Sequence, residues 1–98
     1  MTKPVVILDP HWRRMDELFA PANLARLQTM AEIVWGQDAP IPQAVLQGAL
    51  PRAEVLIAAA PVVRAAELER APNLRAVIEV SGSFPDSIDY QACFDRGI

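Results

Sequence analysis

The sequence predicts an α/β fold, a flavodoxin-like three-layer sandwich in which a parallel sheet lies between two layers of helices. Two observations favour this fold. Four short hydrophobic runs recur along the 98-residue chain, and helical periodicities fill the intervals between them. Runs that are apolar at consecutive positions are typical of strands covered on both faces, as in a parallel sheet. Their alternation with helices implies right-handed crossover connections within a single domain.

Each predicted strand is short and is followed by residues that favour a turn. Gly36 follows the second run and Pro61 follows the third, whereas the fourth run contains one charged residue, Glu79. The last residue, Ile98, reads as the start of a further strand, so the sheet is expected to be incomplete at the C-terminus. The predicted strands are residues 5–8, 33–35, 55–60 and 76–80.

The intervals show the three-to-four-residue spacing of amphipathic helices. Pro21 suits a first helical turn, and Pro42 can open a later helix. The residue before Pro72 avoids the helical region, which ends the preceding helix. Asp89 is a suitable N-cap for the last helix, and Gly97 is a suitable left-handed residue at its end. The four predicted helices are residues 15–30, which continue past Pro21, and residues 42–50, 65–70 and 90–96.

Composition argues against several classes of protein. The chain is 52% hydrophobic and 21% charged, which is ordinary for a globular domain and not for a disordered one. Its net charge of -3 argues against nucleic-acid binding. The first residues form too short an apolar run for a signal peptide, and no segment has the roughly 20 apolar residues that cross a bilayer. One cysteine, Cys93, excludes an internal disulfide, so a cytoplasmic location is expected.

The loop after the first predicted strand contains the only histidine, His11, beside Trp12. No second histidine or thiolate accompanies it, so no metal site is predicted. A surface histidine without chemistry is favoured over a general base. A hydrolase that used His11 with Asp9 would lack a nucleophile. Arg13 and Arg14 are offset by acidic neighbours, which indicates a solvated helix start.

Cys93 shares the apolar face of the last predicted helix with Tyr90 and Phe94. It is expected to be a core thiol, because no histidine or lysine is placed to lower its pKa. Neither G-x-G-x-x-G nor G-x-x-x-x-G-K-[ST] occurs, so the chain has no dinucleotide or nucleoside triphosphate fingerprint. No catalytic, cofactor-binding or metal-binding residue is therefore predicted within these 98 residues.

The strongest functional signal is the loop after the fourth predicted strand. Ser81, Gly82 and Ser83 are small residues whose backbone N–H groups can face outward and form a concavity for a carboxylate. Ligands of α/β folds also bind beyond the carboxyl ends of the strands. Composition alone favours a plain strand-to-helix connection, with Gly82 at positive φ, over a ligand loop.

A resemblance changes this balance. The stretch APNLRAVIEVSGSFPDSIDYQACFDRGI resembles the D-isomer-specific 2-hydroxyacid dehydrogenases. In that family a P-x-L-[KR] entry, a strand, a Gly-containing substrate loop, I-D and a helix ending in R-G-I follow in this order. The loop departs from the common G-V-G-x-D-N-I-D, because it is one residue longer and lacks the second glycine, so the chain looks like a divergent branch. The matching residues are Pro72, Leu74, Arg75, Gly82, Ile88, Asp89, Arg96, Gly97 and Ile98.

The resemblance implies that residues 1–98 are a single, truncated substrate-binding domain from the N-terminal part of a two-domain oxidoreductase. In this family a hydride passes between NAD(H) and C2 of a 2-hydroxy or 2-keto acid, which would be the small-molecule partner. The backbone amides of Ser81, Gly82 and Ser83 would hold the substrate carboxylate, with Phe84 as a wall of the pocket. The catalytic residues and the NAD(H) or NADP(H) site are expected in a nucleotide-binding domain absent from this chain, so the chain alone is not expected to be active.

A function of another class stays open: a small, self-contained α/β interaction domain. An incomplete parallel sheet exposes a strand edge and apolar surface, through which such a domain would form a homodimer. The two hypotheses assign residues 81–86 differently, to a substrate loop in the first and to a contact surface in the second.

Overall fold

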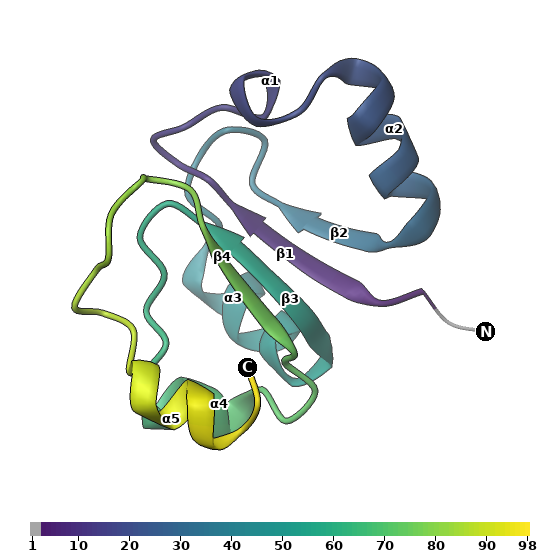
Figure 1. Ribbon diagram of the computed structural model, residues 1–98. Helices are drawn as coiled ribbons and strands as arrows, with labels where there is room; N and C mark the ends of the chain where they lie inside the picture. The colour runs from purple at the N-terminus through teal and green to yellow at the C-terminus, as the bar shows by residue number, and fades with distance from the viewer. Residues whose placement is uncertain (1–2) are drawn as a thin grey trace.

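Residues 3–98 are described by a computed structural model, in which four parallel strands form one sheet with helices on both faces (Figure 1). The strand order is β2-β1-β3-β4. This order matches the first four strands of a flavodoxin-like sheet, and the α/β prediction is confirmed. No helix among these residues is long and apolar enough to cross a membrane. The strands are β1 (Val5–Asp9), β2 (Glu32–Trp35), β3 (Ala53–Ala58) and β4 (Ala76–Glu79).

The helices divide between the two faces of the sheet because alternate residues of a strand point to opposite sides. Val6 and Leu8 of β1 pack with the first two helices, whereas Ile7 packs with the other three. Burial of these three residues is complete or nearly so, which makes β1 the centre of both core layers. The helices are α1 (Met15–Leu18), α2 (Pro21–Met30), α3 (Gln43–Ala49), α4 (Ala65–Arg70) and α5 (Tyr90–Asp95), and a 3-10 turn covers Leu50–Arg52.

All four strands differ from the predicted ranges by at least one residue, and β3 differs most. β3 runs from Ala53 to Ala58 instead of over 55–60, because Ala53 already pairs with Val5. Ala59 is buried without being a strand residue, which explains why the hydrophobic run continues beyond the sheet. Ile98 does not begin a strand in the described residues; its N–H donates to the Cys93 carbonyl, 2.9 Å away, and closes the end of α5.

The ends of α5 follow the prediction closely. The Asp89 carboxylate accepts a hydrogen bond from the Ala92 N–H at 2.9 Å, and Gly97 has φ +74°. The Arg96 guanidinium donates to the carbonyls of Leu68 and Ala71, at 2.6 and 3.0 Å, at the end of α4. A cation at a helix C-terminus is favourable. The R-G-I ending therefore joins α5 to α4.

Cys93 is a core residue, as predicted, but the rest of the apolar face that it shares is exposed. Cys93 is buried, but Tyr90 is 37% exposed and Phe94 is 68% exposed. The three positions share one stripe of the helix, and only its middle meets the core. Tyr90 instead donates from its hydroxyl to the Pro85 carbonyl at 3.2 Å.

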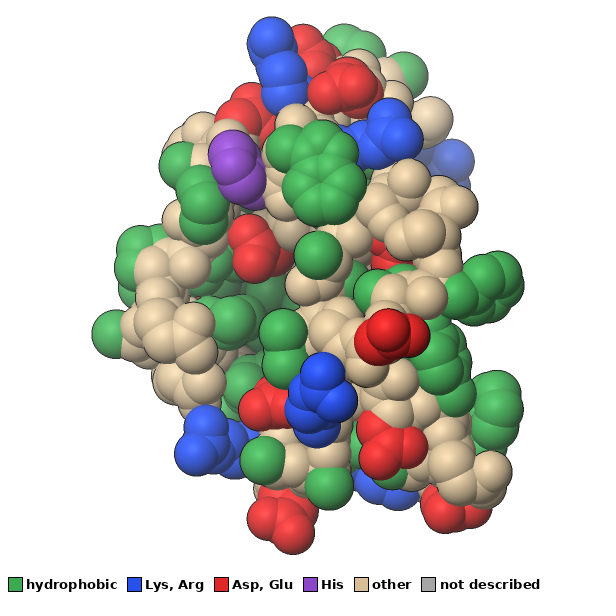
Figure 2. Space-filling view, turned by 90° about the vertical axis from the view of Figure 1, so that its left-hand side faces the viewer, with side chains coloured by type: hydrophobic (Ala, Val, Ile, Leu, Met, Phe, Trp, Pro, Cys, Tyr) green, Lys and Arg blue, Asp and Glu red, His purple; other side chains and the backbone are tan. Residues whose placement is uncertain are grey.

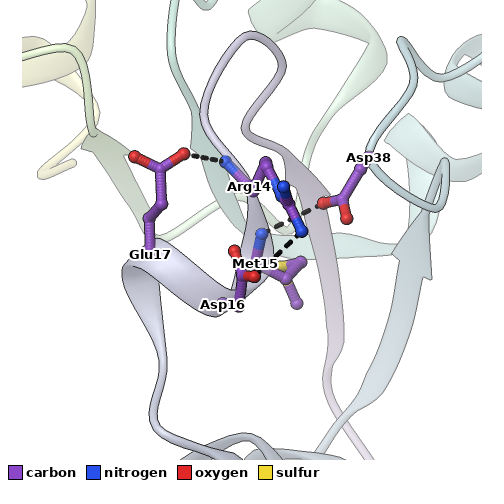
Figure 3. A network of polar contacts seen from close by, with 5 residues as sticks. All are labelled: Arg14, Met15, Asp16, Glu17 and Asp38. Atoms are coloured by element: carbon purple, nitrogen blue, oxygen red, sulfur yellow. Dashed lines mark hydrogen bonds and ion pairs between the residues drawn. The ribbon is translucent and has the colours of Figure 1, made fainter.

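Local hydrogen bonds account for the charged residues around α1 (Figure 3). The Glu17 carboxylate accepts from the Arg14 N–H at 2.9 Å, and the Asp38 carboxylate accepts from the Met15 N–H at 3.0 Å. The Arg14 guanidinium pairs with Asp16 at 3.0 Å. These groups satisfy a helix start, as predicted, and the Arg14 guanidinium is occupied by Asp16.

Candidate functional site

The carboxyl ends of the four strands open onto one side of the molecule, where the predicted substrate loop lies. Figure 2 views this side and shows acidic, basic and hydrophobic side chains interspersed, with no single charged field. The loop over residues 80–89 is tied to the loop that follows β3. The Val63 N–H donates to the Ser87 carbonyl at 2.9 Å, and the Asp89 N–H donates to the Val63 carbonyl at 2.8 Å. The C-terminal end of the loop is thus fixed.

This parallel bridge between Val63 and Ile88 was not foreseen from the sequence. Both side chains are buried, although each lies in a loop rich in polar residues or proline. A hydrophobic residue in each of two loops at the same edge of the sheet was the available signal. The Ser87 hydroxyl adds a hydrogen bond to the Pro61 carbonyl at 2.5 Å.

The backbone amides of the predicted site converge on a carboxylate, and that carboxylate belongs to the chain itself. The N–H groups of Gly82 and Ser83 each donate to Oε2 of Glu79 at 3.1 Å, and the Ser81 N–H donates to Oε1. Gly82 has φ +88°, which turns successive N–H groups toward one point. The loop is therefore a backbone nest that fits a carboxylate.

Hydrogen bonding also perturbs the acidity of Glu79. The Ser81 side chain and the backbone amides of Ser81, Ser83 and Gly82 lower the pKa of the Glu79 carboxyl below its usual value of 4.5, and desolvation opposes them. Donors that contact a carboxylate favour its charged form. The nest thus prefers an ionised carboxylate to a protonated one.

Sequence reasoning selected Ser81, Gly82, Ser83 and Phe84 and missed Glu79. The three small residues do come together around one acceptor, whereas Phe84 stands 89% exposed at the tip of the loop. Glu79 was the single charged residue of the fourth hydrophobic run, and that interruption was the signal. Binding of a substrate carboxylate by this loop stays a prediction.

A groove of about 470 Å³ runs from the nest along the outer edge of β4 to α5. Its walls include the loop residues Gly82, Ser83 and Phe84, and Glu79 lies in it as well. The remaining lining is mostly apolar and comes from β4, α5 and the end of the chain: Val77, Ile88, Tyr90, Cys93, Phe94 and Ile98. The site thus combines a polar carboxylate holder with an apolar wall, as small-molecule sites commonly do.

The other candidate residues form no catalytic arrangement. Burial raises the pKa of the Cys93 thiol, and Asp89 adds to this effect, which is the opposite of an activated nucleophile. His11 Nδ1 lies 3.4 Å from the Asp38 carbonyl oxygen, and the Asp9 carboxylate accepts from the Ile41 N–H at 3.2 Å. The His11 and Asp9 side chains therefore contact different partners. Within residues 3–98 no three metal-ligating side chains come together.

The described residues do not fit a dinucleotide. A pyrophosphate needs a glycine-rich turn that leads from a strand into a helix N-terminus. Here β1 leads through Asp9-Pro10-His11-Trp12 into α1, a helix of four residues whose first amides are held by Glu17 and Asp38. The turn after β1 therefore offers no cradle for the cofactor.

Comparison with solved structures relates the chain to an oxidoreductase. It matches a phosphoglycerate oxidoreductase from Rhizobium etli with a TM-score of 0.81 and 30% sequence identity. The match covers 98% of this chain but 29% of that protein, so the chain spans less than a third of its length. No protein-family model and no curated protein matched the chain.

Proposed function

We propose that the chain belongs to the D-isomer-specific 2-hydroxyacid dehydrogenase family, which it resembles in sequence, and that it is the N-terminal substrate-binding segment of an NAD-dependent enzyme. In this proposal the whole enzyme transfers a hydride between the nicotinamide and C2 of a 2-hydroxy or 2-keto acid. A nucleotide-binding domain outside these residues supplies the site for NAD(H) or NADP(H) and the groups that move protons. The 98 residues orient the substrate.

The observation that carries this proposal is the nest around Glu79. Three backbone N–H groups already hold a carboxylate, and every 2-hydroxy acid carries one. The groove beside the nest supplies an apolar wall for the remainder of a small acid. Fixing the carboxylate would leave C2 in a defined place, which contributes orientation to hydride transfer rather than chemistry.

The test is binding of glycolate, the smallest 2-hydroxy acid, to the ¹⁵N-labelled chain. We expect the amide resonances of Ser81, Gly82 and Ser83 to shift with glycolate and to stay in place with glycolamide, its uncharged analogue. The control variant is Gly82→Ala, which strains a residue at φ +88° and should abolish the response without unfolding the domain. Equal shifts with both compounds, or shifts confined to other residues, would contradict the proposal.

A second candidate is the self-associating interaction domain, and the exposed apolar surface beside β4 favours it. Ile78, Phe84 and Phe94 are 48%, 89% and 68% exposed, and β4 is an edge strand with one unpaired side. Exposed edges and apolar patches commonly mark contact sites.

Sedimentation velocity separates this candidate from the first. A tight dimer that dissociates in the Phe94→Ser variant, but not in the matched variant Val45→Ser on exposed α3, would favour the interaction domain. We expect a monomer in the micromolar range, because a surface of a few side chains is small for a stable interface.

A further inference from the structure

Glu79 uses both carboxylate oxygens on the loop, and this leaves none of the three backbone N–H groups of the nest free. Oε2 accepts from Gly82 and Ser83, and Oε1 accepts from Ser81. Each backbone N–H supplies one donor, so the same three groups do not hold a second carboxylate while Glu79 is in place.

We infer that Glu79 is an internal competitor for the substrate carboxylate, so that a 2-hydroxy acid binds the loop only after the Glu79 side chain has left it. The inference rests on the proposed function, because it concerns the same three amides. It assigns Glu79 a role in setting substrate affinity, and no role in the transfer of the hydride.

The surroundings of Glu79 allow this exchange. The ion pairs found within residues 3–98 involve other carboxylates, so the loop amides and the Ser81 side chain are what hold Glu79 in its position. The residue is only partly buried, and it lines the groove, into which its side chain can turn. Moving out therefore breaks the hydrogen bonds of the loop and disturbs no packed core.

The free energy needed to move Glu79 out of the nest weakens the apparent binding of the substrate carboxylate. When the competent state is a fraction of the population, the apparent Kd rises by the inverse of that fraction. Charge-assisted hydrogen bonds are roughly twice as strong as neutral ones, so an ionised Glu79 is expected to occupy the nest for most of the time. Occupancy of about nine-tenths makes the apparent Kd about ten times the intrinsic one.

Acidity gives a second readout that needs no ligand. The pKa of Glu79 is below its usual value, so its contacts with the loop are fully present above pH 4.5 and are lost as the pH falls through the lowered pKa. The other titratable side chains lining the groove are the Tyr90 phenol and the Cys93 thiol, so no second carboxylate side chain lines it. Ile98 also lines the groove and ends the 98-residue chain, so the carboxyl carbon of Glu79 is followed separately from the α-carboxyl of Ile98. The three loop amides should therefore titrate together with the Glu79 carboxyl carbon, with a midpoint below 4.5.

The experiment compares glycolate binding to the ¹⁵N-labelled chain in four forms: wild type, Glu79→Gln, Glu79→Ala and Asp86→Asn. Asp86 lies in the same loop and is exposed, so its variant removes an equal charge without emptying the nest. Chemical-shift titration of Ser81, Gly82 and Ser83 gives each Kd. We expect both Glu79 variants to bind glycolate about tenfold more tightly than wild type, and Asp86→Asn to change the Kd by less than about twofold.

Several results would overturn the inference. If the wild type and both Glu79 variants bind glycolate with equal affinity, and the three amides shift in each, then Glu79 does not compete with the ligand. The proposed function would stay intact. An equal gain in Asp86→Asn would assign the effect to overall charge. Loop amides that do not follow the Glu79 titration would show that Glu79 does not occupy the nest. Absence of shifts at these amides in every form would overturn the proposed function itself.

Discussion

Replacing Ile7 by alanine is expected to lower the free energy of unfolding by about 3–4 kcal/mol. Ile7 lies in the central strand β1, is 0% exposed and packs in the layer formed with α3, α4 and α5. The substitution removes buried hydrocarbon and leaves a cavity that a strand paired on both sides closes poorly. Domains of this size are stable by about 5–15 kcal/mol, so the variant should be marginal.

The measurement is urea and thermal unfolding followed by circular dichroism. We expect the melting temperature to fall by roughly 10–20 °C, from the usual scaling for small domains. Ile78→Ala is the matched control, because Ile78 is an isoleucine of the edge strand β4 that is 48% exposed. It should cost less than about 1 kcal/mol. Equal losses in the two variants would show that the core is not centred on β1.

Replacing Gly36 by alanine is expected to destabilise the domain by about 2 kcal/mol. A Cβ at this position would lie 2.4 Å from the Ala39 carbonyl oxygen and 3.2 Å from the Ile41 nitrogen, so backbone atoms must shift. The turn has little room to relax, because Gln37 and Asp38 already have φ 57° and 67° and the Ala39 N–H donates to the Gly36 carbonyl.

Gly48→Ala provides the opposite control for Gly36. Gly48 lies in α3, and a Cβ there would meet no atom within 4 Å. Alanine is the better helix former, so this variant should gain about 0.5–1 kcal/mol. Unfolding midpoints in urea measure both changes. If the Gly36→Ala variant is as stable as the wild type, a Cβ at position 36 does not clash with the backbone of Ala39 and Ile41.

Most of the fold was predictable because its signals are local. Consecutive hydrophobic residues identify buried strands, and Pro21, Asp89 and Gly97 mark helix ends through their own backbone chemistry. The boundary of β3 was less predictable, since Ala59 is buried by loops and not by the sheet. Burial and strand pairing give the same hydrophobic pattern, and only the pairing register separates them.

The backbone N–H donors of the candidate site were predictable from the sequence, but the carboxylate that accepts from them was not. Small residues after a buried strand indicate outward-facing amides, and this pattern led to Ser81, Gly82 and Ser83. The position of Glu79 depends on the loop turning back over the end of β4, which a linear pattern does not contain. The exposure of Phe94 likewise depends on what covers the outer side of α5.

The two anchors of the substrate loop also determine where its length can vary. Glu79 fixes the first residues of the loop through three amides, and the Val63–Ile88 bridge fixes the last. Only the tip between these anchors, around Phe84 and Asp86, is exposed and free of both. An inserted or deleted residue in related proteins can therefore be absorbed at the tip, without changing the alignment of the amides or the start of α5. The additional residue of this loop would then alter how far its tip reaches over the groove, and leave the carboxylate holder in place.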